Sequence, residues 1–174
     1  MSTVKLGYDF TKVYTTLLNT DPDNECPNLG TIFESADGKA YRFVVNNHAS
    51  ALVVGDVVFC DKTALYPNAV SVLNTDSCGA VAAGIMAGVA MGAIAAAGYG
   101  WIQFAGVGSA KVESTTDIVV GDTLKGVNSQ VYAVTDAAVA VAASYYNHLR
   151  ALLARTDNDA AVVANNVSVN CRVY

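Results

Sequence analysis

Histidine and cysteine most often carry catalysis or metal binding, and this chain has few of either. The two histidines, His48 and His148, are a hundred positions apart, and neither lies beside a cysteine. Nucleophilic catalysis needs a base within hydrogen-bond reach of the nucleophile, and a third group that orients the base. The sequence shows no such grouping and no Gly-x-Ser-x-Gly turn. We therefore predict no catalytic residues and no enzymatic activity.

Metal and cofactor motifs are also incomplete. No two cysteines have the short spacing of a zinc site, and the positions are Cys26, Cys60, Cys78 and Cys171. Counted from Asp21, a calcium loop would need Gly and Glu where the chain has Cys26 and Ile32. The glycine pairs at 98–100 and 106–108 lack the third glycine of a dinucleotide-binding turn. We predict no metal and no cofactor.

The cysteines are expected to be thiols and mostly buried. The first residues show no basic segment followed by an apolar one, so no secretory signal is predicted. Without export, the default state of cysteine is reduced.

The uncharged stretch from 77 to 110 is long enough to cross a bilayer. Its glycines Gly84, Gly88 and Gly92 have the four-residue spacing at which membrane helices pack together. However, the stretch is mostly Ala and Gly, and no Lys/Arg cluster flanks it, so insertion is weakly favoured. We predict either buried, glycine-bent strands or an Ala-rich contact between subunits, and no membrane contact. A membrane-associated protein using residues 77–110 remains the alternative.

The elements that position these residues are expected to be strands. Residues 31–35 and 39–45 flank an Asp37-Gly38 pair, which is a strong hairpin signal. A Gly-Asp turn between β-formers occurs twice, at Gly55 and again at Gly121. Alternating or glycine-punctuated strand patterns also occupy the segments 98–106, 110–114, 130–134 and 162–174.

The fold prediction is an all-β protein, barrel or sandwich, with an extended N-terminal arm. We place the polar arm or loop at 1–28 and a single β-rich domain at 29–174. One short helix is considered near 136–155, because four apolar or aromatic residues have helical spacing, namely Val141, Tyr145, Leu149 and Leu152. A strand–loop–strand path through 136–155 is the alternative.

The amino-acid composition indicates which kinds of partner to expect. Of the 174 residues, 53% are hydrophobic and only 14% are charged, against about 25% charged in an average protein. We expect other chains to cover part of this apolar surplus. The net charge is −5 and the ten Lys and Arg residues are scattered. Nucleic acid, which needs a basic stripe, is therefore not an expected partner.

Five short segments in a fixed order resemble the small head decoration, or cement, proteins of tailed bacteriophages. They are Leu29-Gly30-Thr31, 37–44, 52–56, 99–106 and 120–124. The similarity covers residues 29–135, and Tyr99-Gly100-Trp101-Ile102-Gln103 is its most specific part. It implies a β-rich homotrimer on the capsid exterior, assembled in the host cytoplasm, that bridges and stabilises major capsid protein subunits. A tail or spike component is the alternative within the virion.

The resemblance and the aromatic content together suggest contact residues. The arm is expected to lie across a neighbouring capsid subunit and to become ordered on contact. Aromatic side chains dominate interface energetics, so the interface candidates are Tyr8, Phe10, Tyr14, Tyr99 and Trp101. A core position in a central strand is the alternative for Trp101.

Overall fold

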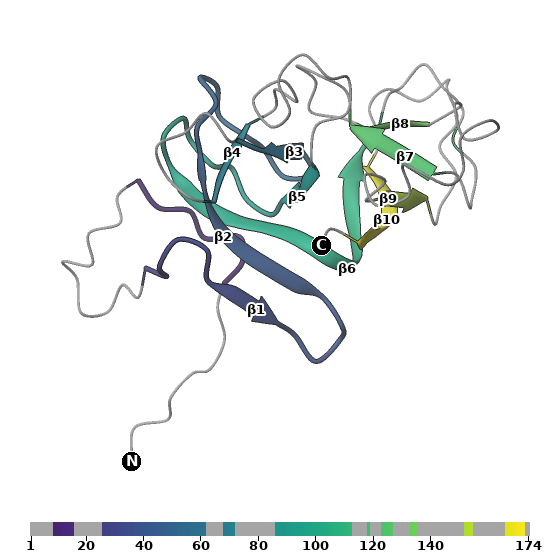
Figure 1. Ribbon diagram of the computed structural model, residues 1–174, viewed down its shortest axis with the longest axis horizontal. Coiled ribbons are helices and arrows are strands. Elements are labelled where there is room, and N and C mark those ends of the chain that lie inside the picture. The colour runs from purple at the N-terminus through teal and green to yellow at the C-terminus, as the bar shows by residue number, and fades with distance from the viewer. Residues whose placement is uncertain are drawn as a thin grey trace.

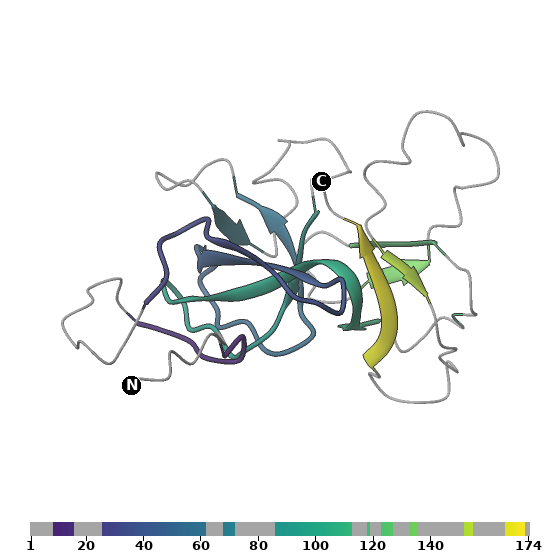
Figure 2. The same ribbon diagram turned by 90° about the horizontal axis from the view of Figure 1, so that it is seen from below.

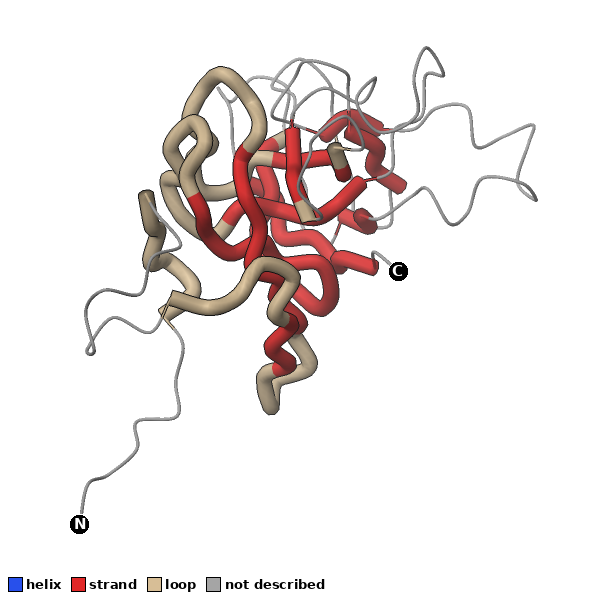
Figure 3. Tube along the Cα trace, turned by 60° about the vertical axis from the view of Figure 1, so that its left-hand side comes forward, coloured by secondary structure: helices blue, strands red, loops and turns tan. Residues whose placement is uncertain are grey.

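The described residues contain ten strands and no helix, which confirms the all-β prediction. The computed structural model describes residues 9–15, 26–61, 68–71, 86–112, 118, 123–126, 133–135, 152–154 and 166–172. The strands, red in Figure 3, are β1 Ile32–Glu34, β2 Ala40–Asn46, β3 Val57–Cys60, β4 Ala69–Ser71, β5 Met86–Ala90, β6 Tyr99–Lys111, β7 Thr123–Gly126, β8 Ala133–Thr135, β9 Leu152–Ala154 and β10 Asn166–Arg172.

Five strands close into a barrel. The hydrogen-bonded order runs β2-β4-β3-β5-β6, and a further pairing of β2 with β6 closes the ring. Of the two predicted architectures, the barrel is therefore the one observed. The closing ladder is antiparallel and runs from Val45 opposite Tyr99 to Ala40 opposite Ala105. Closure gives these five strands partners on both edges, which removes most exposed strand edge.

The predicted hairpin is present as β1 and β2, and Figure 1 shows it extending below the barrel. Gly38 has φ of 79° at the turn, a conformation that glycine adopts at little cost. Beside it, the Lys39 ammonium lies 2.7 Å from the Asp37 carboxylate. This hydrogen bond, with a second from Ser35, lowers the pKa of Asp37 to about 2.

Strand β6 belongs to two parts of the sheet. Its first half pairs with β2, and its second half pairs with β10 from Ala105 to Lys111. Beyond β10 the sheet continues through β9 and β7 to β8. Figures 1 and 2 show the barrel on one side of the molecule and β7 to β10 on the other.

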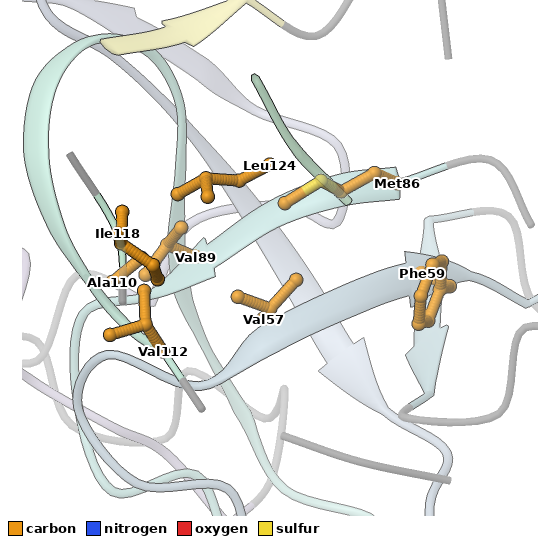
Figure 4. Close-up of a cluster of buried hydrophobic side chains, with 8 residues drawn as sticks. All are labelled: Val57, Phe59, Met86, Val89, Ala110, Val112, Ile118 and Leu124. Atoms are coloured by element: carbon orange, nitrogen blue, oxygen red, sulfur yellow. The ribbon is translucent and has the colours of Figure 1, made fainter. Parts of the chain in front are cut away.

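The barrel strands are buried on both faces. Alternate side chains point inward, and the interior holds Val44, Leu52, Val58, Val70, Ala87, Ala90, Ile94 and Ile102. The outer face toward β7 is covered by a second cluster (Figure 4), made of Val57, Phe59, Met86, Val89, Ala110, Val112, Ile118 and Leu124. A third, aromatic cluster covers another part of the outer face, around Tyr41, Phe43 and Trp101. Much of the apolar surplus is therefore packed inside the chain.

The described part of the uncharged stretch forms barrel strands β5 and β6, joined by the loop 91–98. No helix among the described residues is long and apolar enough to span a membrane. Gly88, with φ of 152°, lies so close to β6 that a Cβ would meet the Gln103 backbone oxygen. Gly88 therefore allows close strand packing, whereas Gly84 lies outside the described residues.

The helix considered near 136–155 does not extend to its predicted end. Residues Leu152–Ala154 form strand β9, which pairs with β10 and β7. Pairing on both edges is the physical reason, because a helix here would leave β10 and β7 each with one unpaired edge. Residues 136–151 and 155 lie outside the described residues, as does the second Gly-Asp turn at Gly121.

Candidate functional site: an arm seat and a loop tip

The residues with possible chemistry are dispersed. Cys26 and Cys60 are half-buried thiols, and burial raises the pKa of Cys26. The backbone N–H of His48 donates to the Asn46 side-chain oxygen, and His148 lies outside the described residues. Within the described part of the chain, no three His, Cys, Asp or Glu side chains are grouped to hold a metal ion.

The predicted interface residues lie close to one another, on the chain's own barrel. Phe10, Tyr14 and Tyr99 are half-buried there. Trp101 is 1% exposed, which is the core position considered as its alternative. Tyr8 lies outside the described residues.

Residues 9–15 are the described part of the predicted arm, and from here on they alone are called the arm. They form a turn and then pair with β6. The Asp9 carboxylate accepts hydrogen bonds from the backbone and the hydroxyl of Thr11, and these bonds lower the pKa of Asp9. Tyr14 N–H donates to the Tyr99 oxygen at 2.8 Å, and Tyr99 N–H donates back at 2.7 Å. The arm, the purple segment in Figure 1, thus forms one antiparallel β-bridge to β6, at the edge opposite β2.

Aromatic rings hold the arm on the barrel. The Phe10 ring stacks on Tyr41, with centroids 3.9 Å apart and planes 10° apart. It also meets the edge of Trp101 at 5.3 Å. The Tyr14 ring lies edge-on to Phe43 at 5.6 Å. Such pairs add stabilisation beyond the area that they bury, and burial raises the pKa of Tyr41.

Three glycines of loop 91–98 and β6 lie against the arm. A Cβ on Gly92 would lie 2.6 Å from the Thr11 backbone oxygen. A Cβ on Gly98 would lie 3.3 Å from the Tyr14 oxygen, and one on Gly100 would lie 3.4 Å from a Val13 methyl group. We call this surface the seat, formed by Gly92, Gly98 and Gly100 with the rings of Tyr41 and Trp101.

The structure also presents an Ala-rich surface, which the sequence left open as a subunit contact within 77–110 without locating it. Loops 47–54 and 91–98 lie side by side at one end of the barrel, joined by a hydrogen bond from Leu52 N–H to the Ile94 oxygen. We call these two loops the loop tip. Val53 is 44% exposed and Val54 53% exposed. The other exposed apolar side chains of the tip are Ala49, Ala51, Ala93, Ala95, Ala96 and Ala97.

Asn46 fixes the two loops to each other. Its buried side-chain amide donates to the backbone oxygens of Ser50, Ile94 and Ala95 at 2.9 to 3.1 Å. Its backbone oxygen accepts from Ala97, and its backbone N–H donates to Gly98. A single buried polar residue therefore sets the conformation of both loops.

A buried ion pair fixes the turn that carries the exposed valines. Asp56 is 2% exposed, and its carboxylate contacts the Lys111 ammonium at 2.6 Å. The other carboxylate oxygen accepts from Val53 N–H at 2.7 Å. The Lys111 N–H also donates to the Gly55 oxygen. The Gly-Asp turn predicted from the sequence is thus tied to the end of β6.

The tip is apolar, exposed and uncharged. Neither loop contains Asp, Glu, Lys or Arg. The signal was present in the sequence as a run of small residues without charge, but the same run is compatible with a buried strand. An exposed apolar surface rimmed by polar residues is typical of a protein contact site.

Comparisons with known proteins give a structural likeness and no match to a family model or a curated sequence. No protein-family model matches the chain, and no curated protein matches its sequence. Among solved structures, the chain is similar to the head fiber gp8.5 N base in bacteriophage phi29. The two chains are 13% identical, and the match covers 75% of this chain and 93% of that chain with a TM-score of 0.47.

Proposed function

We propose that this protein is a structural component of a tailed-phage virion. In this role it binds the outer surface of the capsid as a homotrimer, and it stabilises the lattice by bridging major capsid subunits. The role requires no catalysis, cofactor, membrane or nucleic acid. Its mechanism is mass action: a protein that binds only the assembled shell stabilises that shell.

The loop tip is the observation that carries the proposal. It consists of two eight-residue loops, 47–54 and 91–98, which are hydrogen-bonded to each other and expose mainly small apolar side chains, held in place before any partner arrives. Preorganised apolar surface binds a partner with little loss of conformational entropy. The ordered segments that resemble decoration proteins, residues 37–44 and 99–106, build the barrel strands that support this tip.

Substitution of Val54 tests the contact. We expect Val54→Asp to weaken binding to expanded, purified capsids at least about tenfold, because a buried carboxylate would lose its hydration at the interface. Ile32→Asp is the matched control, since Ile32 is 51% exposed but lies on β1 outside the tip. Binding is measured by co-sedimentation with shells, and folding by circular dichroism.

Equal binding by Val54→Asp and Ile32→Asp would remove the tip as the contact. Cryo-electron microscopy of particles carrying the protein tests its location. Density over junctions between major capsid subunits supports the proposal, whereas density on the tail alone would replace it with the tail or spike alternative.

A further inference from the structure

The arm is held by fewer backbone contacts than any barrel strand. One reciprocal pair of hydrogen bonds, between Tyr14 and Tyr99, joins it to β6. By contrast, β2 and β6 are paired at six positions. Segments with few backbone bonds and half-buried side chains open locally, without unfolding of the whole domain.

Opening of the arm would expose apolar rings and an unpaired strand edge to water, which is unfavourable. The β6 edge at Tyr99 would lose its partner, and the rings of Tyr41 and Trp101 would lose the Phe10 ring that covers them. An unpaired strand edge beside apolar rings is a template for another extended segment.

The shape and the aromatic rings of the seat restrict which extended segments can bind there. At Gly92 the arm backbone lies so close that a Cβ would be 2.6 Å from the Thr11 oxygen, a distance that any side chain there would forbid. The aromatic wall of the seat accepts rings separated by four positions, as Phe10 and Tyr14 are. A second copy of this chain carries the same segment and can make the same contacts.

We propose that the arm of one copy occupies the seat of a neighbouring copy in the assembled protein, so that each seat is completed in trans. Exchange of identical elements conserves every contact and is a low-cost route to association. The ten residues 16–25 can extend to about 35 Å, which allows the arm to reach a touching copy. Because it concerns contacts between copies, this proposal does not depend on capsid binding.

Isotope-mixed cross-linking tests the exchange in the full chain. Tyr14 and Tyr99 form a reciprocal hydrogen-bonded pair, and the Cα separation of such pairs, about 5.5 Å, suits a disulfide. The double variant Tyr14→Cys/Tyr99→Cys is prepared unlabelled and labelled with ¹⁵N, then mixed, refolded together and oxidised. Mass spectrometry reads the linked peptides that contain positions 14 and 99.

Exchange predicts that up to half of these linked peptides join a light and a heavy chain. The proposal would be overturned if every linked peptide joined two light chains or two heavy chains. The variant Tyr14→Cys/Ile32→Cys measures random collision between chains, because Ile32 is exposed outside the seat. Mixed pairs at or below that background also overturn the proposal.

Complementation provides a second test that needs no disulfide. One variant, Gly92→Leu, has a blocked seat and an intact arm, and the other, Phe10→Ala/Tyr14→Ala, has an open seat and no aromatic anchors. We expect the tagged second variant to retain the first in a pull-down. A control partner carries Gly92→Leu together with both alanines, and equal retention of this control would overturn the proposal.

Discussion

At the scale of single residues, Asn46 has the largest influence on the proposed contact surface. It is fully buried, and its amide donates to three backbone oxygens of the two loops. Two of these oxygens, those of Ile94 and Ala95, also accept from backbone N–H groups of the tip. We expect Asn46→Ala to lower the free energy of unfolding by about 2–4 kcal/mol, because the buried amide and its three hydrogen bonds to the loops would be lost. Asn47→Ala removes the hydrogen bond from the Asn47 amide to the Asp61 carboxylate. It should lower the free energy of unfolding by less than Asn46→Ala does.

Chemical denaturation measures both variants, and hydrogen exchange locates the change. Faster exchange confined to loops 47–54 and 91–98 in Asn46→Ala is the expected result. Equal stability of the two variants would contradict the role given to the Asn46 amide.

Two glycines separate backbone strain from steric overlap. At Gly38 an added Cβ would meet nothing within 4 Å, so Gly38→Ala should cost only the strain of its positive φ, about 1–2 kcal/mol. At Gly88 a Cβ would also overlap the backbone of Gln103, so Gly88→Ala should cost about 3 kcal/mol or more. Thermal melting of the two variants compares their losses of stability. A larger loss in Gly38→Ala than in Gly88→Ala would contradict this assignment of strain and overlap.

At the scale of elements, the arm acts as an additional part of the barrel wall. We expect Phe10→Ala to destabilise the protein by about 1–3 kcal/mol, because it removes a stacked ring. It should also shift the fluorescence of Trp101, the chain's single tryptophan, to longer wavelength as water reaches the indole. Phe104→Ala is the control, since Phe104 is half-buried and stacks under Arg42 instead. An unchanged emission maximum in Phe10→Ala would show that the ring does not shield Trp101.

The elements differ in how well the sequence predicts them. The β1–β2 hairpin follows from local turn chemistry at Gly38, so its strands could be placed. The arm seat could not be predicted from the sequence, because Gly92 and Thr11 meet only through tertiary packing. Burial on both faces also hides strand periodicity, as in Val57, Val58 and Phe59, which are all buried. The 1–28 and 29–174 boundary stays a prediction.

At the scale of the whole molecule, the low charge content has two causes. Part of the apolar surplus covers the two faces of the barrel, and part is exposed at the tip. The first part is covered by the chain itself. The tip is the part of the described surface that we propose to bind the capsid.

An uncharged contact surface has a measurable consequence for attachment. Ionic contacts weaken with salt because the Debye length falls from about 10 Å at 0.1 M to about 3 Å at 1 M. Apolar contacts do not weaken in this way. We expect shell binding to change less than about threefold between 0.1 and 1 M NaCl. A loss of tenfold or more would point to charged contacts outside the tip.

The closing ladder of the barrel also determines when the fold can form during synthesis. Its partners are residues 45 and 99 at one end and 40 and 105 at the other, separated by 54 and 65 residues. At about 5–20 residues per second, translation needs roughly 3–13 s to supply the missing strand. Throughout that interval β2 emerges from the ribosome without β6, so the nascent chain, and not the finished barrel, carries the greatest hazard of aggregation.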